Sequence, residues 1–283
     1  MIIDTHVHIW NRERSDYEWL KEVPDQLNRD YSLVDLEPDR SITSVKAGVL
    51  VQADNSWADT ELMLESAKVT DWIKGVVGWL PLMNTKKAQQ FLERVLAKEP
   101  YYKGVRHLIH NEADDEWLLQ SSVIDSLKLL VRLQLPFDLV GVKVSHIKTA
   151  LKLAEKIPDL RMVFDHLNQP PIQSGEHFGA WGTWMKAAAQ NPNFYVKISG
   201  LSATAGKELF TVEKVKPYVN FVLEAFGENR CFLGGDWPVA LLSASYNELW
   251  KVYTQVIDEL VGDQDLQCLI KSENAKAFYS LEV

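Results

Sequence analysis

The sequence predicts an α/β fold, a single (β/α)8 TIM barrel, and three observations lead to this prediction. Eight short apolar runs rich in β-branched residues alternate with longer stretches in which apolar residues repeat at helical spacing. The chain has 283 residues, and such a barrel typically needs about 250. No Ser/Gly-rich linker, low-complexity tract or obvious internal repeat interrupts the sequence. We therefore expect residues 1–283 to form one domain.

The eight predicted strands are separated by helical patterns, which favours parallel pairing, and eight such strands close into a barrel with a filled interior. The expected strands are Met1–Thr5, Ala47–Gln52, Gly75–Leu80, Tyr102–His107, Pro136–Val140, Arg161–Asp165, Phe194–Ile198 and Arg230–Gly234. The expected helices are Asp59–Thr70, Lys86–Lys98, Glu116–Gln134, Ile147–Lys156, Trp181–Asn191, Thr211–Phe226 and Ser245–Leu260. Active sites of such barrels lie at the carboxyl ends of the strands. Residues that end the predicted strands are therefore the candidates for chemistry.

The stretch Asn11–Arg40 departs from this rhythm, because it is too long for an ordinary connection between a strand and a helix. It contains Tyr17, Trp19, Pro24 and Tyr31 among many charged residues. We expect an aromatic-rich insertion after the first strand that lies over the mouth of the barrel. It would act either as a lid or substrate wall, or as a surface excursion packed on its own aromatic side chains.

The composition argues against several classes of partner. The formal net charge is −9, whereas nucleic acids and anionic membranes need a basic surface. No stretch approaches the ~20 apolar residues of a membrane span, and the first residues lack a basic segment before an apolar run. We expect a cytoplasmic protein with a small-molecule substrate and no nucleic-acid or membrane partner; a homo-oligomer is compatible with the sequence. Cys231 and Cys268 lack metal-site spacing and are expected to be buried free thiols.

The first predicted strand leads into His6-Val7-His8. In an extended chain residues i and i+2 point to the same side, so both imidazoles would face the barrel mouth. Two such side chains can share a metal ion or clamp one oxyanion, and neutral imidazole is a good ligand for zinc. The alternative is a pair of polar residues that cap the barrel without a function.

His166 and Asp236 end the sixth and eighth predicted strands. His166 follows Asp165 after an apolar run, and its alternative role is a hydrogen bond to the backbone. Asp236 follows Gly234 and Gly235, which let the backbone turn sharply. A carboxylate at the centre of the mouth can bind a metal and act as a general base toward water. The alternative for Asp236 is a helix N-cap.

Arg106 ends the fourth predicted strand, where its fork suits a carboxylate or carbonyl oxygen of a substrate. An ion pair with a loop acid is the alternative. Arg106 with Lys197 or Lys143 would favour an acidic substrate, whereas tryptophans would favour stacking on a sugar face. His110 and His177 are expected at the surface or in loops. The candidate substrate-binding residues are Trp10, Gln52, Trp79, Arg106, His107, Asp138, His146, Lys197 and Trp237.

Five sequence blocks occur in an order that resembles the sugar-lactonase branch of the amidohydrolase-2 family. That branch includes L-fuconolactonase and L-rhamnonolactonase type enzymes and the 2-pyrone-4,6-dicarboxylate lactonase. The likeness covers nearly the whole chain, up to Asn274-Ala275-Lys276-Ala277-Phe278-Tyr279. The blocks are Asp4-Thr5-His6-Val7-His8-Ile9-Trp10, Gly104-Val105-Arg106-His107, Phe164-Asp165-His166-Leu167 with Pro170-Pro171, Lys197-Ile198-Ser199-Gly200-Leu201, and Asp236-Trp237-Pro238.

The resemblance implies that His6, His8, His166 and Asp236 form the hydrolytic centre and that Arg106 holds the substrate. The branch resembles both enzymes that use a metal and enzymes that work without one, so a divalent ion, zinc or manganese, is an open expectation. No organic cofactor is expected. Four features depart from the family pattern. The fifth strand, Phe137-Asp138-Leu139, lacks a histidine; Val142-Lys143-Val144 precedes Ser145-His146 where an arginine–proline type sequence is expected; Asn168 replaces a usual glycine; and Gly235 replaces a usual serine.

The resulting hypothesis is a hydrolase that opens the ring of a small sugar or dicarboxylate lactone. Asp236 would take a proton from water and return it to the leaving ring oxygen. His6, His8 and His166 would bind an ion or donate hydrogen bonds to the carbonyl oxygen. The alternatives are a metal-dependent decarboxylase of the amidohydrolase-2 type, a non-catalytic sugar- or acid-binding barrel, and a structural or interaction protein.

Overall fold

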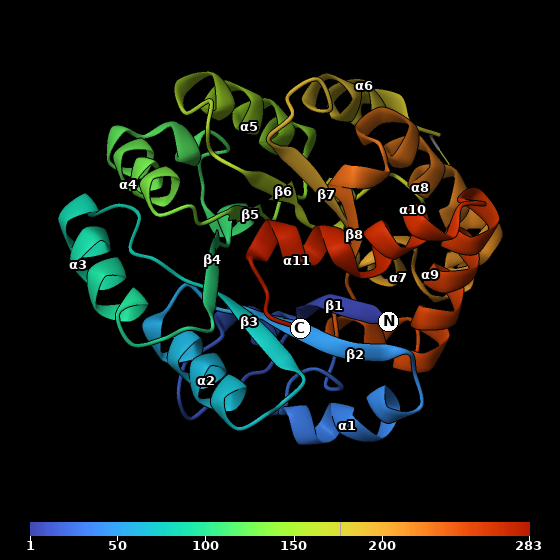
Figure 1. Cartoon of the computed structure of the whole chain (residues 1–283), viewed down its shortest axis with the longest axis horizontal. Helices are drawn as coiled ribbons and strands as arrows, with labels where there is room; N and C mark the ends of the chain where they lie inside the picture. The colour runs from blue at the N-terminus through green and yellow to red at the C-terminus, as the bar shows by residue number, and fades with distance from the viewer. Residues whose placement is uncertain (176) are drawn as a thin grey trace.

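The structure is a computed structural model that describes residues 1–175 and 177–283. Its eight strands run parallel and pair in chain order from β1 to β8. Figure 1 shows them as a ring with the longer helices around its outside. The predicted (β/α)8 barrel is therefore confirmed, and every predicted strand overlaps an observed one. The strands are β1 (Ile2–Val7), β2 (Val45–Val51), β3 (Ile73–Gly78), β4 (Tyr102–His107), β5 (Phe137–Leu139), β6 (Met162–Phe164), β7 (Phe194–Ile198) and β8 (Cys231–Leu233).

Helices fill the connections between strands, and short polar side chains start several of them. Ser56, for example, accepts a hydrogen bond from the backbone of Asp59, the third residue of α2. No helix in the described ranges combines the length and the apolar character needed to cross a membrane. The helices are α1 (Leu33–Ser41), α2 (Trp57–Lys68), α3 (Thr85–Leu96), α4 (Ser121–Arg132), α5 (Val144–Lys156), α6 (Gly179–Ala188), α7 (Leu201–Ala205), α8 (Val212–Phe226), α9 (Tyr246–Leu260), α10 (Gln264–Cys268) and α11 (Asn274–Tyr279).

Three expectations need correction. Residues 11–40 are not all insertion, because α1 occupies their last part. This helix starts at a capping box formed by Ser32 and Asp35, and it is the first helix on the outside of the barrel. The expected helix Glu116–Gln134 is a 3-10 turn, η3 (Trp117–Leu119), followed by α4, because Gln120 between them has extended backbone. Of the two free thiols, one is buried but Cys268 is exposed.

The barrel closes between β8 and β1 through both backbone and side chains. The backbone N–H of Asp236 donates to His6 O at 2.7 Å, and that of His8 donates to Trp237 O at 2.7 Å. One layer lower, Thr5 Oγ1 donates to Leu233 O at 2.7 Å. Closure of the barrel therefore places Asp236 beside His6 and His8, although Asp236 follows the last strand and the two histidines lie at the end of the first.

The interior of the barrel is filled, and α11 covers its amino-terminal end. Ile3, Val77, Val163 and Phe232 from four strands pack in one buried cluster with Phe278 of α11. Figure 1 looks onto this end, where α11 crosses in front of the strands. The opposite, carboxyl end of the strands is therefore the end left for a site.

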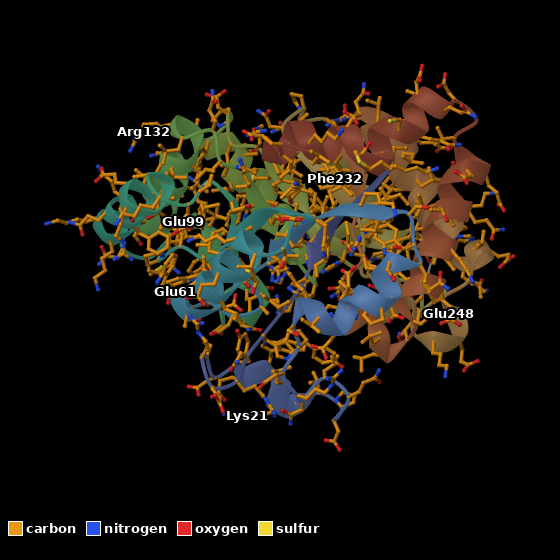
Figure 2. All side chains as sticks on the ribbon, turned by 60° about the horizontal axis from the view of Figure 1, so that its bottom comes forward. Lys21, Glu61, Glu99, Arg132, Phe232 and Glu248 are labelled. Carbon is orange, nitrogen blue, oxygen red and sulfur yellow. The ribbon has the colours of Figure 1, made fainter. Side chains whose placement is uncertain are left out.

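The insertion between β1 and α1 is anchored to the barrel by aromatic side chains. Tyr17 is fully buried and donates to Asp59 Oδ1 at 2.8 Å. Trp19 donates its indole N–H to Ala53 O at 2.9 Å and packs edge-on against Trp10, with ring centroids 5.2 Å apart. Figure 2 shows this segment, marked by Lys21, standing out from the body of the barrel. The insertion is thus an ordered wall beside the mouth.

Candidate active site

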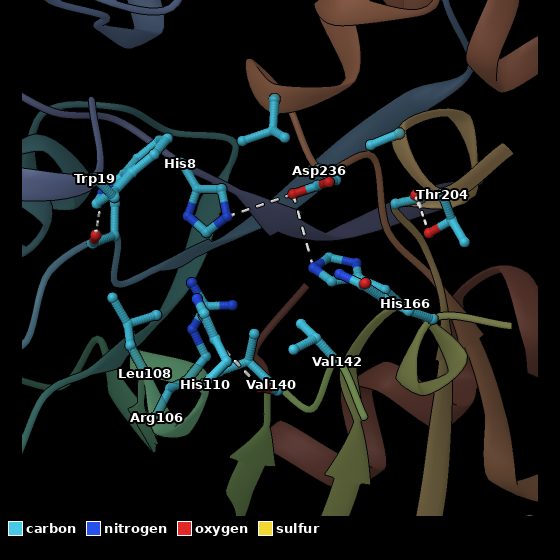
Figure 3. A pocket seen from close by; sticks show the side chains of 15 residues that line it. His8, Trp19, Arg106, Leu108, His110, Val140, Val142, His166, Thr204 and Asp236 are labelled. Carbon is cyan, nitrogen blue, oxygen red and sulfur yellow. Dashed lines mark hydrogen bonds and ion pairs between the residues drawn. The ribbon is translucent and has the colours of Figure 1, made fainter. Parts of the chain in front are cut away.

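A cavity of about 270 Å³ opens at the carboxyl ends of the strands. This volume is near the lower end of the range for small-molecule sites, about 300–1,000 Å³. Both polar and apolar side chains form its wall (Figure 3). The lining residues are His8, Trp19, Ala53, Arg106, Leu108, His110, Val140, Val142, His166, Gln169, Gly200, Ala203, Thr204, Asp236 and Val239.

His6 and His8 reach the site from the end of β1, and both are buried. Their Nε2 atoms lie 3.1 Å apart. The Nδ1 atom of His8 lies 2.7 Å from Val51 O, and a carbonyl oxygen can only accept, so His8 carries its proton on Nδ1. The Nε2 atom of His8 therefore presents a lone pair to the centre of the site.

His166 follows β6 in an unusual backbone turn. Residues 166–169 all have positive φ, between 50° and 55°, which costs free energy for residues other than glycine. The surrounding structure holds the turn, because Trp181 donates its indole N–H to Leu167 O at 2.7 Å. Ser199 Oγ lies 2.9 Å from His166 Nδ1, so the Nε2 atom of His166 faces the cavity.

Asp236 follows β8 and also has a left-handed backbone, with φ 58°. Its Oδ1 atom lies 3.5 Å from His8 Nε2 and 3.8 Å from the Nε2 atoms of both His6 and His166. Figure 3 shows His8 and His166 pointing toward Asp236 from two sides of the cavity. The three imidazoles and the carboxylate thus converge on one point.

Gly200 makes this convergence possible. A Cβ atom at this position would lie 2.4 Å from His166 Nδ1 and 3.1 Å from Asp236 Oδ2, and the residue has φ +61°. Both the contact and the backbone therefore require glycine. Gly234 and Gly235 also let neighbouring side chains come close to the backbone. A Cβ atom at Gly234 would lie 2.7 Å from His6 Cβ, and one at Gly235 would lie 2.5 Å from Asp4 Oδ2.

Arg106 projects from β4 into the wall of the cavity, but most of its donors are already used. Its Nη1 atom donates to Asp165 Oδ2 at 3.0 Å and lies 3.2 Å from His6 Nε2. Its Nη2 atom donates to Gln52 O. Its buried Nε atom has no hydrogen-bond partner in the described structure. The positive charge of Arg106 is therefore paired with Asp165, and at least its Nε–H has no acceptor among the described residues.

A layer of buried charges lies directly beneath the site, inside the barrel. Lys197 is fully buried and its Nζ atom lies 2.8 Å from Asp138 Oδ2, 2.8 Å from Asp165 Oδ1 and 3.2 Å from His6 Nδ1. Tyr279 of α11 donates to Asp138 Oδ2 at 2.8 Å. A continuous polar chain therefore joins α11 to His6.

Burial dominates the electrostatics of the imidazoles. It lowers the pKa of His6 well below its ordinary value. The negative charge of Asp165 raises this pKa but offsets only part of the effect of burial, and the positive charge of Lys197 lowers the pKa further. Burial also lowers the pKa of His8, against a smaller opposing effect of Asp236. Burial would raise the pKa of Asp165, but Lys197, His6 and Arg106 outweigh it and hold that pKa well below the ordinary range. His6 and His8 are therefore neutral, and Asp165 is charged.

The donor set fits a divalent ion. His6, His166 and Asp236 offer ligand atoms that all lie within 4.8 Å of one another. The distances from Asp236 Oδ1 to the three imidazoles and between His6 and His8, 3.1 to 3.8 Å, are near the edge of a zinc tetrahedron, about 3.3 Å for bonds of about 2.0 Å. Nitrogen and carboxylate oxygen are ligands that zinc accepts. Arg106 at 3.2 Å from His6 Nε2 is a competing positive charge.

Several predicted substrate-binding residues do not line the cavity. Asp138 and Lys197 point into the barrel interior, one layer below the mouth. Trp10 and Trp237 are buried against Tyr31 rather than exposed to a ligand. The others lie behind the wall of the cavity: Gln52 donates to Arg106 O, Trp79 donates to His107, His107 stacks on Trp117, and His146 accepts from the backbone of Val142.

The cavity also contains residues that the sequence did not single out for it. His110 lines it, although it was expected at the surface or in a loop, whereas His177 is exposed as expected. His110 Nδ1 lies 3.3 Å from Val140 O, and burial lowers its pKa to about 4. Gln169 and Thr204 complete the polar wall. None of them ends a predicted strand, so the strand-end criterion could not find them.

Comparison with known proteins gives consistent results. The sequence profile of a family described as Amidohydrolase matches residues 3–281. An L-fucono-1,5-lactonase of Burkholderia ambifaria is 32% identical over 283 residues, which covers 99% of this chain and 96% of that protein. An L-fucono-1,5-lactonase of Burkholderia multivorans is 28% identical over 266 residues, which covers 87% of this chain and 85% of that protein. The crystal structure of an amidohydrolase from Burkholderia multivorans with bound zinc has a TM-score of 0.89, 25% identity and 100% coverage of both chains.

Proposed function

The chain belongs to the amidohydrolase family, and from this premise we propose that it is a lactonase that opens the ring of a small sugar lactone with water. The observation that carries the proposal is the position of Asp236, whose carboxylate faces three imidazoles at one end of a small cavity. The 32% identity with an L-fucono-1,5-lactonase over nearly the whole chain supports the reaction class.

In the proposed reaction Asp236 acts as the proton carrier. Its carboxylate takes a proton from the attacking water and returns it to the ring oxygen that leaves. One carboxylate is enough, because the leaving alkoxide of a lactone stays attached to the same molecule. His166 and Arg106 lie beside it in the cavity wall and stabilise the negative charge that develops on the carbonyl oxygen.

A divalent ion, zinc or manganese, would be held by His6, His8, His166 and Asp236. Such an ion supplies Lewis-acid polarisation of the carbonyl and a lower pKa of a bound water. The rest of the proposal depends on this chain's own groups. Gly200 and Ser199 keep His166 against Asp236, and the closed backbone between β8 and β1 keeps His6 and His8 opposite them.

The charges in the cavity favour a neutral sugar lactone over a dicarboxylate lactone. Arg106 is the one lysine or arginine among the described lining residues, and it is already paired with Asp165. His110, Gln169 and Thr204 offer neutral hydrogen-bonding groups of the kind that bind hydroxyls. The apolar residues of the wall, such as Leu108, Val140 and Val142, suit the carbon face of a small sugar.

A panel of lactones, followed by acid release at constant pH, tests the proposal. Aldonic and aldaric lactones are supplied to the wild-type enzyme, Asp236→Asn and Asp30→Asn, with and without added Zn²⁺ or Mn²⁺. Asparagine tolerates a left-handed backbone as aspartate does, so Asp236→Asn keeps the fold. Asp30, an exposed acid on the insertion, is the matched control. We expect aldonic lactones to be opened and Asp236→Asn to lose about 10²–10⁴ in kcat/KM.

Two outcomes would overturn the proposal. Near wild-type turnover by Asp236→Asn would remove Asp236 from the chemistry. Release of carbon dioxide from aromatic acids, without hydrolysis of any lactone, would favour the decarboxylase alternative instead.

A further inference from the structure

Lys197 meets His6 from beneath the site, at a place where no substrate can reach it. The Nζ atom lies 3.2 Å from His6 Nδ1, and both side chains are fully buried. An ammonium group has three protons and no lone pair, so it can only donate. Its three neighbours at hydrogen-bonding or ion-pairing distance are Asp138, Asp165 and His6. The contact requires His6 Nδ1 to be an acceptor.

The other side of the ring leads to the same assignment. His8 carries its proton on Nδ1, where it faces Val51 O, and therefore presents a lone pair at Nε2. His6 Nε2 lies 3.1 Å from that lone pair. Two facing lone pairs at this distance repel each other, so the contact needs a proton on His6 Nε2. A neutral His6 with its proton on Nε2 satisfies His8 and Lys197 at once.

Two contacts favour the opposite assignment, but one of them, Asp165 Oδ1 at 3.5 Å from His6 Nδ1, is long for a hydrogen bond. Arg106 Nη1 lies 3.2 Å from His6 Nε2 and could donate to a lone pair there. Arg106 Nη1, however, has Asp165 Oδ2 as a closer, charged acceptor at 3.0 Å. The Nε2 atom of His8 has His6 as its sole hydrogen-bond partner within the described structure. The proton on His6 Nε2 therefore leaves fewer groups unsatisfied.

A metal ion needs the atom on which this proton sits. Zinc binds a lone pair of neutral imidazole, so His6 Nε2 must lose its proton to become a ligand. The ring would then carry the proton on Nδ1, facing the ammonium group of Lys197. Asp165 Oδ1 lies 3.5 Å from His6 Nδ1 and accepts no well-directed hydrogen bond, although Lys197 is nearby. It is the acceptor that the ring would use in the metal-bound state.

We propose that Lys197 is a positioning residue that holds the proton of His6 on Nε2 and thereby weakens the affinity of this site for a divalent metal ion. Lys197 touches no substrate and acts only through His6. The inference rests on the proposed function in one respect: it takes the group formed by His6, His8, His166 and Asp236 as the active site. It predicts a site that binds zinc reversibly and stays ordered when the ion leaves.

The first test needs no variant of Lys197. Two-bond ¹H–¹⁵N correlation spectra of the metal-free protein distinguish a protonated from an unprotonated ring nitrogen, and His6→Gln assigns the signals of His6. We expect His6 to be protonated on Nε2 and His8 on Nδ1 in the absence of metal, and His6 to switch to Nδ1 on addition of Zn²⁺. A metal-free His6 protonated on Nδ1 would overturn the proposal.

The second test measures zinc binding by competition with a chromogenic chelator. The double variant Lys197→Met with Asp138→Asn removes one positive and one negative charge, so a change in affinity cannot come from net charge. We expect it to bind Zn²⁺ at least about tenfold more tightly, the size of effect typical of groups that orient a metal ligand. Tyr279→Phe is the control, because it removes a contact of Asp138 without touching His6.

Unchanged zinc affinity in a folded double variant would overturn the proposal. If the double variant does not fold, the spectra of the wild-type protein still decide the matter. Neither measurement uses a substrate. Either can therefore contradict the role of Lys197 while the enzyme still hydrolyses lactones, and a lack of lactone hydrolysis would leave both measurements valid.

Discussion

His6 and Asp236 are joined twice, once through the backbone and once across the cavity. The N–H of Asp236 donates to His6 O at 2.7 Å, and the Oδ1 atom of Asp236 lies 3.8 Å from His6 Nε2. The same pair of residues therefore closes the barrel and brings two reactive groups together. Conditions that open the seam between β8 and β1 should remove the site before they unfold the rest of the protein.

Asp4 holds this seam, and its replacement should show the connection. Its Oδ1 atom accepts from the backbone of His6 at 2.9 Å and of Gly235 at 2.6 Å, and its Oδ2 atom accepts from Tyr246 at 2.8 Å. We expect Asp4→Ala to lower the free energy of unfolding by about 2–4 kcal/mol, because it leaves buried donors unpaired. Urea denaturation measures the change, and Asp4→Asn, which keeps an acceptor, should lose less. Equal stability of Asp4→Ala and wild type would contradict this role.

We expect Gly200 to be needed because a side chain there would contact His166, and a second glycine serves as the control. Gly200→Ala places a Cβ atom against His166 and also strains a backbone with φ +61°. Gly227→Ala also strains its backbone, and more so, because Gly227 has φ 77° and ψ 159° whereas Gly200 has φ 61° and ψ 8°, but its Cβ atom would meet nothing within 4 Å. We expect Gly200→Ala to lose about 1–2 kcal/mol of stability and Gly227→Ala at least as much, and only Gly200→Ala to lose at least about tenfold in kcat. Thermal denaturation and lactone turnover measure the two effects. A similar kcat for both variants would show that the contact with His166 is unimportant.

Trp19 tests whether the insertion serves the substrate. It lines the cavity and is fixed by its hydrogen bond to Ala53 O. We expect Trp19→Ala to raise KM by about tenfold, equivalent to about 1.4 kcal/mol of binding, with a smaller change in kcat. Steady-state kinetics on the best lactone of the panel provide both constants. Trp184→Ala, which removes an indole from α6 beside Lys148, is the control and should leave KM unchanged.

Asp59 should make stability depend on pH. Burial raises its pKa from 3.8 to about 7, so the folded state binds a proton that the unfolded state releases. This contribution to stability is complete below the unfolded pKa and is lost as the pH rises through the folded pKa. Between pH 5 and pH 8 the loss amounts to about 2–3 kcal/mol for a shift of this size.

Replacing Asp59 with asparagine removes this titration, so the stability of the variant relative to wild type should rise between pH 5 and pH 8. Urea denaturation of both proteins at the two pH values measures it, and other buried acids cancel in the difference. A constant difference between the two proteins would contradict the expectation.

The rhythm of the sequence was sufficient to predict the barrel, because each apolar run must be buried and each intervening helix must cover it. The same reasoning correctly brought His6, His8, His166 and Asp236 to one end of the strands. It could not tell which side of a strand end faces the cavity. Lys197 therefore looked like a residue of the mouth, whereas it lies in the layer below.

Loops were less predictable for a physical reason. The path of a loop depends on long-range contacts, such as the hydrogen bond from Tyr17 to Asp59, which leave no periodic pattern in the sequence. Trp19 and His110 reach the cavity by such paths. The capping box at Ser32 was a local signal that could have located α1, but the exposed Val34 and the internal Pro38 obscured its helical pattern.

The hydrogen bond from Tyr279 to Asp138 has a consequence for biosynthesis. Asp138 and Lys197 precede α11 in the chain, so they are synthesised before the helix that covers them. In the folded barrel Tyr279 donates to Asp138 Oδ2, and Phe278 packs with the apolar side chains at the amino-terminal end of the strands. The charged layer beneath the proposed active site can therefore be completed only after all eight strands have been synthesised.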